Sequence, residues 1–318
     1  MASFLQDQPV VAEVVRNGLV ESVHHGVVVG LDAAGNVALQ VGDPGRVIYA
    51  RSSSKPIQAV AMLRSGLDLD GELLALAAAS HSGEAFHAEG ARRILAAAGL
   101  AESALQCPPA LPMEPDDLAR YLRDGGEPDA VLMNCSGKHA AMLATCVVNG
   151  WPTDTYTEPA HPLQEVIRGT LEEFTGDRIT QAAVDGCGAP LFGFTLLGLA
   201  RAFRALGLGA AGSIERRVAD AYRDHPEWTS GTRREEARLM RAVPGLVNKA
   251  GAEGVDALVL PDGRTVAIKI ADGSQRARVP VAVAALRRLG VDGPGLDALQ
   301  TSPVLGGGEK VGEIRATI

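Results

Sequence analysis

The stretch Arg51-Ser52-Ser53-Ser54-Lys55-Pro56 joins a segment typical of a strand to a segment typical of a helix. Upstream, residues 47–50 (Val-Ile-Tyr-Ala) have the pattern of a strand end, and downstream residues 57–63 carry apolar side chains at helical spacing. Pro56 suits a first helical turn, because the N–H that proline lacks would have no partner there. The stretch therefore predicts a boundary between a sheet and a helical part of the molecule.

Within this stretch, Ser52 and Lys55 are three residues apart at the predicted helix start, so we expect their side chains on one face and in contact. A serine hydroxyl becomes a good nucleophile when a neighbour takes its proton, and a desolvated neutral lysine can do so. The alternative is that the serines cap the helix and that Lys55 is solvated. A pattern this short also arises by chance about once in a chain of this length.

Lysine usage favours the catalytic interpretation. Of the 30 basic residues, only five are lysines: Lys55, Lys138, Lys249, Lys269 and Lys310. Arginine serves this chain wherever a generic positive charge suffices, so lysine is expected where arginine cannot replace it. A general base is such a place, because arginine does not deprotonate in proteins.

Composition and charge restrict the class of protein. A chain of 318 residues with 46% hydrophobic residues can bury a substantial core, and its net charge of −8 argues against nucleic acid or an anionic membrane as a partner. Residues 1–7 lack the basic and apolar regions of a signal peptide, and no apolar run reaches the length of a membrane span. The cysteines, at 107, 135, 146 and 187, show no framework spacing, so free thiols in a reducing cytoplasm are expected.

The expected elements run as strands, then many helices, then strands and a terminal helix. Strands are expected at 10–15, 26–31, 37–41, 256–260 and 265–270. Helices are expected at 70–79, 84–97, 116–123, 161–174, 190–206, 213–223, 233–243 and 281–289. Strands from both chain ends can pair in one antiparallel sheet, so the predicted class is α+β with a central helical lobe. We expect one two-lobed unit over 1–318, with the sheet lobe at about 1–50 and 250–318 and the helical lobe at about 51–249.

Further polar segments interrupt apolar runs at expected element ends, at residues 80–84, 134–139 and 184–190. Helix caps alone would explain the serines of 80–84. The segment 134–139 is more informative, because it repeats the arrangement of an apolar approach, a polar cluster and a helix whose N-terminus can bind negative charge. Asn134, Ser136 and Lys138 are unusual together in a plain cap and indicate function.

Together these segments resemble the bacterial L-asparaginase II family, the type with a β-lactamase-like fold rather than a threonine nucleophile. The resemblance spans nearly the whole chain and rests on Arg51-Ser-x-x-Lys55-Pro56, Ser80-His-Ser-Gly-Glu84, Asn134-Cys-Ser-Gly-Lys-His139, Asp185-Gly-Cys187 and Val247-Asn-Lys-Ala-Gly251. It implies the two-lobed fold of serine β-lactamases and glutaminases, and a homodimer. It also implies hydrolysis of the small molecule L-asparagine to L-aspartate and ammonia.

The resemblance further implies two Ser–Lys pairs, Ser52–Lys55 and Ser80–Lys249. We expect Ser52 to be the nucleophile with Lys55 as its base, and the second pair, which could tune proton transfer or carry the nucleophile itself, stays open as the alternative. It also implies a zinc ion beside the substrate, held by Cys135, Lys138 and Cys187. On the residues alone, two cysteines outside C-x-x-C spacing are typical of buried thiols as well. A lysine that binds zinc would also need a strongly lowered pKa.

An amino-acid substrate needs a cation for its α-carboxylate and an acid for its α-ammonium group. The candidates for substrate binding are Arg51, Glu84, Asn134, Ser136, Lys138, His139 and Asp185. Preference for asparagine or glutamine turns on one methylene, worth only about 1–3 kcal/mol, so glutaminase activity stays open. A peptidase or β-lactamase with S-x-x-K chemistry is a second alternative, although no Lys-Thr-Gly segment is present, and a non-enzymatic binding module is a third.

Overall fold

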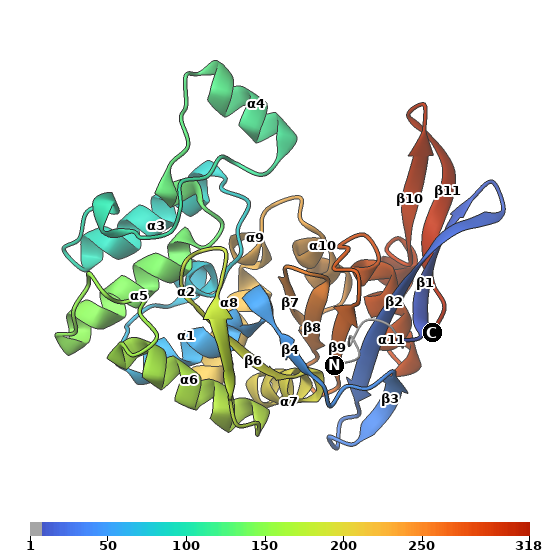
Figure 1. Cartoon of the computed structure of the whole chain (residues 1–318), viewed down its shortest axis with the longest axis horizontal. Coiled ribbons are helices and arrows are strands. Elements are labelled where there is room, and N and C mark those ends of the chain that lie inside the picture. Colours follow the sequence, from blue (N-terminus) through green and yellow to red (C-terminus); the bar gives the residue numbers. More distant parts are fainter. Residues whose placement is uncertain (1–7) are drawn as a thin grey trace.

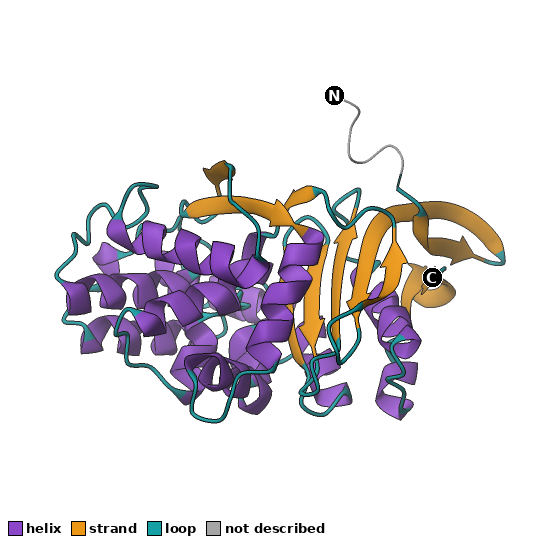
Figure 2. Ribbon diagram, turned by 90° about the horizontal axis from the view of Figure 1, so that it is seen from below, coloured by secondary structure: helices purple, strands orange, loops and turns teal. Residues whose placement is uncertain are grey.

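The computed structural model describes residues 8–318 and consists of one large antiparallel sheet beside a body of helices (Figure 1, Figure 2). This arrangement confirms the predicted α+β class. Residues 1–7, on which the expectation of no signal peptide rests, lie outside the described residues, as does that part of the expected sheet lobe. Within residues 8–318, no helix combines the length and the apolar character needed to cross a bilayer.

The large sheet takes its strands from both ends of the chain, as predicted. The link is β2 (Leu19–Leu31), which pairs antiparallel with β1 (Val10–Arg16) on one side and with β9 (Thr265–Ile270) on the other. The order across the sheet is β10-β11-β1-β2-β9-β8-β7, and β3 also pairs with β2. The remaining strands are β3 (Val37–Val41), β7 (Val247–Gly251), β8 (Val255–Val259), β10 (Thr301–Gly306) and β11 (Glu309–Ala316).

Helices cover both faces of the sheet at its centre. Successive residues of a strand point to opposite faces, and in β8 Ala257 lies in the core shared with α7 (Leu196–Gly207) while Leu258 lies in the core under α11 (Arg278–Arg288). Every residue of β8 is therefore buried.

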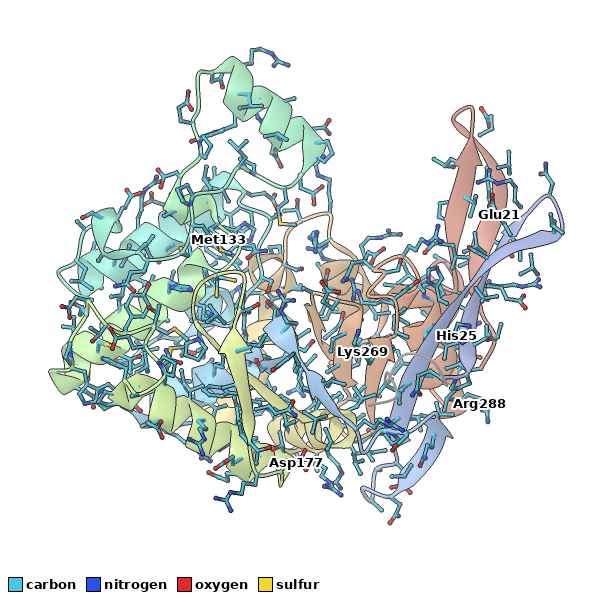
Figure 3. The ribbon with its side chains drawn as sticks, viewed as in Figure 1. Glu21, His25, Met133, Asp177, Lys269 and Arg288 are labelled. Carbon is cyan, nitrogen blue, oxygen red and sulfur yellow. The ribbon has the colours of Figure 1, made fainter. Side chains whose placement is uncertain are left out.

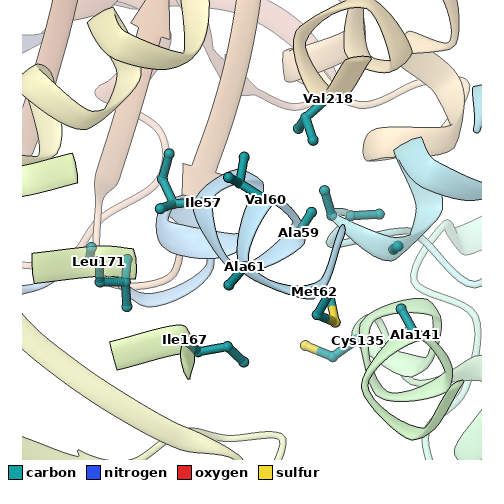
Figure 4. Packing of buried hydrophobic residues seen from close by; sticks show 14 of the residues in the cluster. Ile57, Ala59, Val60, Ala61, Met62, Cys135, Ala141, Ile167, Leu171 and Val218 are labelled. Atoms are coloured by element: carbon teal, nitrogen blue, oxygen red, sulfur yellow. The ribbon is translucent and has the colours of Figure 1, made fainter. Parts of the chain in front are cut away.

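The helical body is built around α1 (Lys55–Arg64), which is buried from Lys55 to Leu63. A helix enclosed on all sides carries apolar or small residues around its circumference, and Ile57, Val60 and Met62 pack against the surrounding helices (Figure 4). The other helices are α2 (Gly71–Ala77), α3 (Ala85–Ala97), α4 (Pro115–Arg123), α5 (Ser136–Asn149), α6 (Pro162–Thr175), α8 (Ile214–Asp224), α9 (Pro226–Thr229), α10 (Glu235–Ala242) and α12 (Pro294–Asp297), with 3-10 turns η1 (Arg51–Ser54), η2 (Glu102–Ala104) and η3 (Ala130–Leu132).

Two expected elements are wrong. The predicted helix at 190–206 begins as strand β6 (Pro190–Thr195), which pairs with β4 (Val47–Tyr49) and β5 (Gln181–Val184) in a small separate sheet. Phe192 and Phe194 in this segment suit a pleated surface, which favours the strand.

The chain also does not end in a helix. After α11 and the short α12, the hairpin of β10 and β11 completes the large sheet. Its turn contains Gly307 and Gly308, which have φ of 60° and 89°, a region that glycine adopts readily. The glycine-rich segment is therefore a hairpin turn.

The edge strand β7 is the part of the sheet that contacts the helical body. The Ser53 hydroxyl donates a hydrogen bond of 2.9 Å to the Lys249 carbonyl, which fastens η1 to this strand. At Gly251 a Cβ atom would lie 2.5 Å from the Ala50 carbonyl oxygen, so only glycine permits this approach. The end of β7, η1 and the start of α1 therefore meet at the boundary that the sequence predicts.

Candidate active site

A cavity of about 630 Å³ opens at this boundary. The sheet side contributes β7 and α11, and the helical side contributes η1, the segment after α2 and the start of α10. In Figure 3, Lys269 marks the sheet side and Met133 the helical side of the molecule. The polar lining consists of Ser52, Ser80, Glu114, Asn134, Arg233, Arg234, Glu235, Glu236, Gln275, Arg276 and Arg278. Two hydroxyls thus share one cavity with side chains of both charges.

Lys55 reaches this cavity from inside the core. Its side chain is only 1% exposed, and its Nζ donates hydrogen bonds to the Ala79 carbonyl oxygen at 2.5 Å and to Ser80 Oγ at 2.9 Å. Nζ also lies 3.0 Å from Cys135 Sγ. The carbonyl groups at the C-terminal end of a helix attract cations, which explains why the lysine extends toward the end of α2.

No hydrogen bond joins the Ser52 and Lys55 side chains in the described structure, so their predicted pairing stays a prediction. Lys55 is directed to Ser80 instead, and within residues 8–318 the Ser52 hydroxyl makes no hydrogen bond. Ser52 nevertheless lines the same cavity as Ser80. The structure therefore brings both predicted serines together and pairs Lys55 with the second.

Lys249 is a buried amine on β7. Its Nζ donates a hydrogen bond of 2.6 Å to the Ala250 carbonyl oxygen. Burial, reinforced by the charge of Lys55, lowers the pKa of Lys249 to about 7. This shift favours the neutral form of Lys249 far more than an exposed lysine allows, and a neutral amine can accept a proton from a hydroxyl.

Among the residues predicted to bind substrate, Asn134 alone lines the cavity within the described chain. Arg51 is engaged elsewhere, since its Nε donates to Asp185 Oδ1 at 2.7 Å. Glu84 accepts hydrogen bonds from the Ser82 and Thr232 side chains. The binding roles predicted for these residues stay predictions.

Three further candidates lie at the start of α5. The buried Ser136 hydroxyl donates a hydrogen bond of 2.7 Å to the Val131 carbonyl, and His139 Nδ1 lies 2.7 Å from the Tyr156 hydroxyl. Lys138 is buried, with Nζ 3.2 Å from Cys187 Sγ. These side chains therefore form a polar layer beneath the cavity rather than its lining.

The predicted zinc ligands Cys135, Lys138 and Cys187 belong to this layer. Zinc in proteins is almost always bound by four ligands in a structural site, or by three ligands and water in a catalytic site. Within residues 8–318, no group of three or more His, Cys, Asp or Glu side chains is arranged to hold a metal ion. Two thiols and an amine therefore do not by themselves make up a zinc site of the usual composition. Zinc binding, which the family resemblance implies, stays an untested prediction. Metal analysis of protein purified without chelators, alongside Cys135→Ala, tests it.

Sequence reasoning missed the charged cavity wall formed by Arg234, Glu236 and Arg278. The first two lie in a charged segment that is typical of a solvated helix. Arg278 gave a usable signal, because it directly precedes the apolar run 279–286, and Asp256 interrupts the apolar strand β8. The two side chains form a buried ion pair, with Arg278 Nη1 2.7 Å from Asp256 Oδ2.

Comparison with known proteins gives one match at the level of sequence families. The sequence model described as L-asparaginase II matches residues 12–316. No curated protein matches the sequence of this chain.

Among solved structures, a beta-lactamase from Mycobacterium bovis is 13% identical, with 90% of this chain and 97% of that chain covered and a TM-score of 0.47. EstCE1, described as a hydrolase with promiscuous acyltransferase activity, is 12% identical over 88% and 92% of the two chains, with a TM-score of 0.41. A Bacillus glutaminase is 12% identical over 79% and 84%, with a TM-score of 0.40. We draw no chemical conclusion from structural similarity at this level.

Proposed function

This chain belongs to the L-asparaginase II family, and we propose that it hydrolyses the side-chain amide of L-asparagine to L-aspartate and ammonia. Membership of the family supports amidohydrolase activity on a small molecule. The geometry of the cavity supports the use of a serine nucleophile and a lysine base.

The observation that carries the proposal is the hydrogen bond of 2.9 Å from Lys55 Nζ to Ser80 Oγ at the cavity wall. A lysine within this distance of a hydroxyl can accept its proton once the amine is neutral. Lys249 supplies a second buried amine, whose pKa burial lowers to about 7. The histidines near the cavity are bonded elsewhere, and among the described residues Lys55 is the titratable side chain within hydrogen-bond distance of a serine hydroxyl that lines the cavity.

In the proposed reaction, a neutral lysine takes the serine proton while the serine oxygen attacks the carboxamide carbon. The C=O bond opens to a tetrahedral oxyanion, which hydrogen-bond donors fixed in the cavity stabilise. The lysine then returns the proton to the nitrogen, the C–N bond breaks and ammonia leaves. Water hydrolyses the resulting ester to L-aspartate and restores the serine.

The contact with Lys55 favours Ser80 as the attacking residue, and Ser52 in the same cavity is the other candidate. Ser52→Ala and Ser80→Ala, assayed for ammonia release from L-asparagine, separate the two. We expect the variant that lacks the nucleophile to lose about 10³-fold or more in kcat, and the exposed Ser22→Ala to keep wild-type turnover.

The proposal fails if wild-type protein releases no ammonia from L-asparagine, or if both folded cavity variants keep wild-type turnover. L-glutamine is assayed in parallel. Turnover of L-glutamine at a higher kcat/KM than L-asparagine would assign the chain as a glutaminase that uses the same chemistry.

A further inference from the structure

Glu236 is a buried carboxylate in the cavity wall that the proposed reaction does not use. Its side chain is 5% exposed, and within the described residues its Oε2 atom has no hydrogen-bond partner. The nearest cationic groups are Arg234 Nε, 3.7 Å from Oε2, and Arg278 Nη2, 3.7 Å from Oε1. Both distances exceed that of a direct hydrogen bond. A buried oxygen that accepts no hydrogen bond destabilises the folded protein unless a ligand supplies the missing donor.

The carboxylate is nevertheless held in its charged form. Burial by itself would raise the pKa of Glu236, but the nearby Arg278 and Arg234, and Lys249 when it is protonated, hold the pKa below its ordinary value. The cavity wall therefore presents a permanent acceptor for a positively charged donor.

The two arginines beside Glu236 differ in how many of their N–H groups already donate hydrogen bonds within the protein. Arg278 donates to Asp256, Glu235 and Gln275 at 2.7, 3.2 and 2.6 Å, so its guanidinium group is committed within the protein. The guanidinium of Arg234 donates no hydrogen bond within residues 8–318, and its side chain is 32% exposed at the cavity. Arg234 is therefore available to an anionic group of a ligand.

We propose that Glu236 and Arg234 form a clamp for the amino-acid head of the substrate. Glu236 accepts a hydrogen bond from the α-ammonium group, and Arg234 donates hydrogen bonds to the α-carboxylate. Arg234 Nε and Glu236 Oε2 are 3.7 Å apart, so two groups on one carbon atom can reach both. The inference rests on the proposed function for the identity of the reacting amide, and it names the residues that restrict the substrate class to free α-amino acids.

The test is binding of the reaction product and of its two truncated analogues to the wild-type protein. Calorimetry compares L-aspartate with succinate, which lacks the α-ammonium group, and with β-alanine, which lacks the α-carboxylate. Charged hydrogen bonds to a buried partner are worth about 10- to 100-fold in affinity, so we expect L-aspartate to bind at least tenfold more tightly than either analogue. Affinities within threefold of one another overturn the clamp.

Variants of Glu236 and Arg234 test which charged group of the ligand each residue recognises. Glu236→Gln keeps the shape of the side chain and removes its charge, and we expect it to weaken L-aspartate by at least tenfold and succinate by less than threefold. Arg234→Gln should weaken L-aspartate and succinate but leave β-alanine within threefold. The matched control is Glu215→Gln, the same charge change at a carboxylate that is bonded to Arg64 and does not line the cavity. It should leave the preference for L-aspartate over succinate within threefold of wild type.

Equal weakening of L-aspartate and succinate by Glu236→Gln would mean that Glu236 acts only through the protein around it, and would overturn the clamp. If Glu236→Gln does not fold, the clamp is tested by the wild-type affinities for the three ligands and by the affinities of Arg234→Gln for the same ligands.

Ammonia release from L-asparagine is measured on the same preparations, so that the two proposals fail separately. Selective binding of L-aspartate without ammonia release contradicts the proposed reaction and supports the clamp. Ammonia release without selective binding contradicts the clamp and supports the reaction. Absence of both contradicts both.

Discussion

Two helix starts in this molecule have similar sequences and different surroundings. Residues 51–56 span the start of the buried helix α1, and residues 134–139 span the start of α5, which is buried over most of its length. Each places a buried lysine against a cysteine, with Lys55 Nζ 3.0 Å from Cys135 Sγ and Lys138 Nζ 3.2 Å from Cys187 Sγ. Only the first lysine also contacts a hydroxyl that lines the cavity.

The electrostatic surroundings of the lysines at the two helix starts also differ. Burial alone would lower the pKa of Lys138, but Cys187 and Cys135 raise it above its ordinary value. The pKa of Cys187 is lowered well below its ordinary value by its contact with Cys135 and then by the charge of Lys138. The directions of these shifts favour a charged Lys138 beside a Cys187 thiolate, whereas Lys55 contacts a hydroxyl that lines the cavity. A polar cluster at a helix start does not show which of these two roles its lysine has.

The largest effect is expected when the lysine that contacts the cavity hydroxyl is removed. Lys55→Met keeps the length of the side chain and removes the amine, so we expect kcat/KM for L-asparagine to fall by about 10³-fold or more. Lys269→Met, at a lysine bonded to the Glu253 and Ile270 carbonyls, is the matched control and should keep turnover within threefold. A Lys55→Met protein that is folded and retains a tenth of wild-type activity would remove the distinction between the two helix starts.

Lys249→Met should cost about 10²-fold in kcat/KM and at the same time stabilise the fold at neutral pH. The pKa of Lys249 is about 7 in the folded protein, below the ordinary value for lysine of about 10.4. Between these values the unfolded chain binds more protons, so the contribution of this lysine to stability improves as pH rises from 7 to 10.

Thermal unfolding measured from pH 7 to pH 10 checks this sign. The melting temperature of Lys249→Met should exceed that of the wild type at pH 7, and the difference should shrink toward pH 10. A difference that grows with pH would contradict the assigned charge state.

The smallest effect on turnover is expected at the second helix start. Lys138→Met removes a counter-ion beneath the cavity, so it should lower kcat/KM by tenfold or less and lower the free energy of unfolding by about 1–3 kcal/mol. Steady-state kinetics and denaturant titration measure the two quantities. A loss as large as that of Lys55→Met would mean that Lys138 acts in the reaction, as its predicted role in substrate or zinc binding requires.

Local pattern was sufficient for much of the fold. Short apolar runs at 256–260 and 265–270 and at the N-terminal strands predicted a sheet formed from both chain ends. The β10–β11 hairpin was missed because its glycine turn resembles a loose tail in sequence. Similarly, Phe194 pairs with Ile48 of β4, and a pairing between residues so distant in the sequence leaves no local pattern that predicts the strand.

The candidate site was predictable where a polar residue ends an apolar element, as at Ser52, Ser80 and Asn134. It was not predictable for Glu236, because a charged residue on a short helix has the same sequence pattern whether solvent or a cavity wall surrounds it. The sequence pattern also could not identify the hydrogen-bond partner of Lys55, because Ser80 is 25 residues away and is brought to Nζ by the packing of α2 against the core.

The central claim is that an uncharged buried lysine activates a serine hydroxyl between the sheet and the helices. The pH dependence of kcat/KM for L-asparagine, from pH 5.5 to 9, tests it most directly. With the pKa of Lys249 lowered to about 7, its neutral fraction rises through neutral pH, so kcat/KM should rise with pH across this range and then level off. This rise should be absent from the residual activity of Lys249→Met. A wild-type profile that is flat across this range, or that falls as pH rises, would contradict the account.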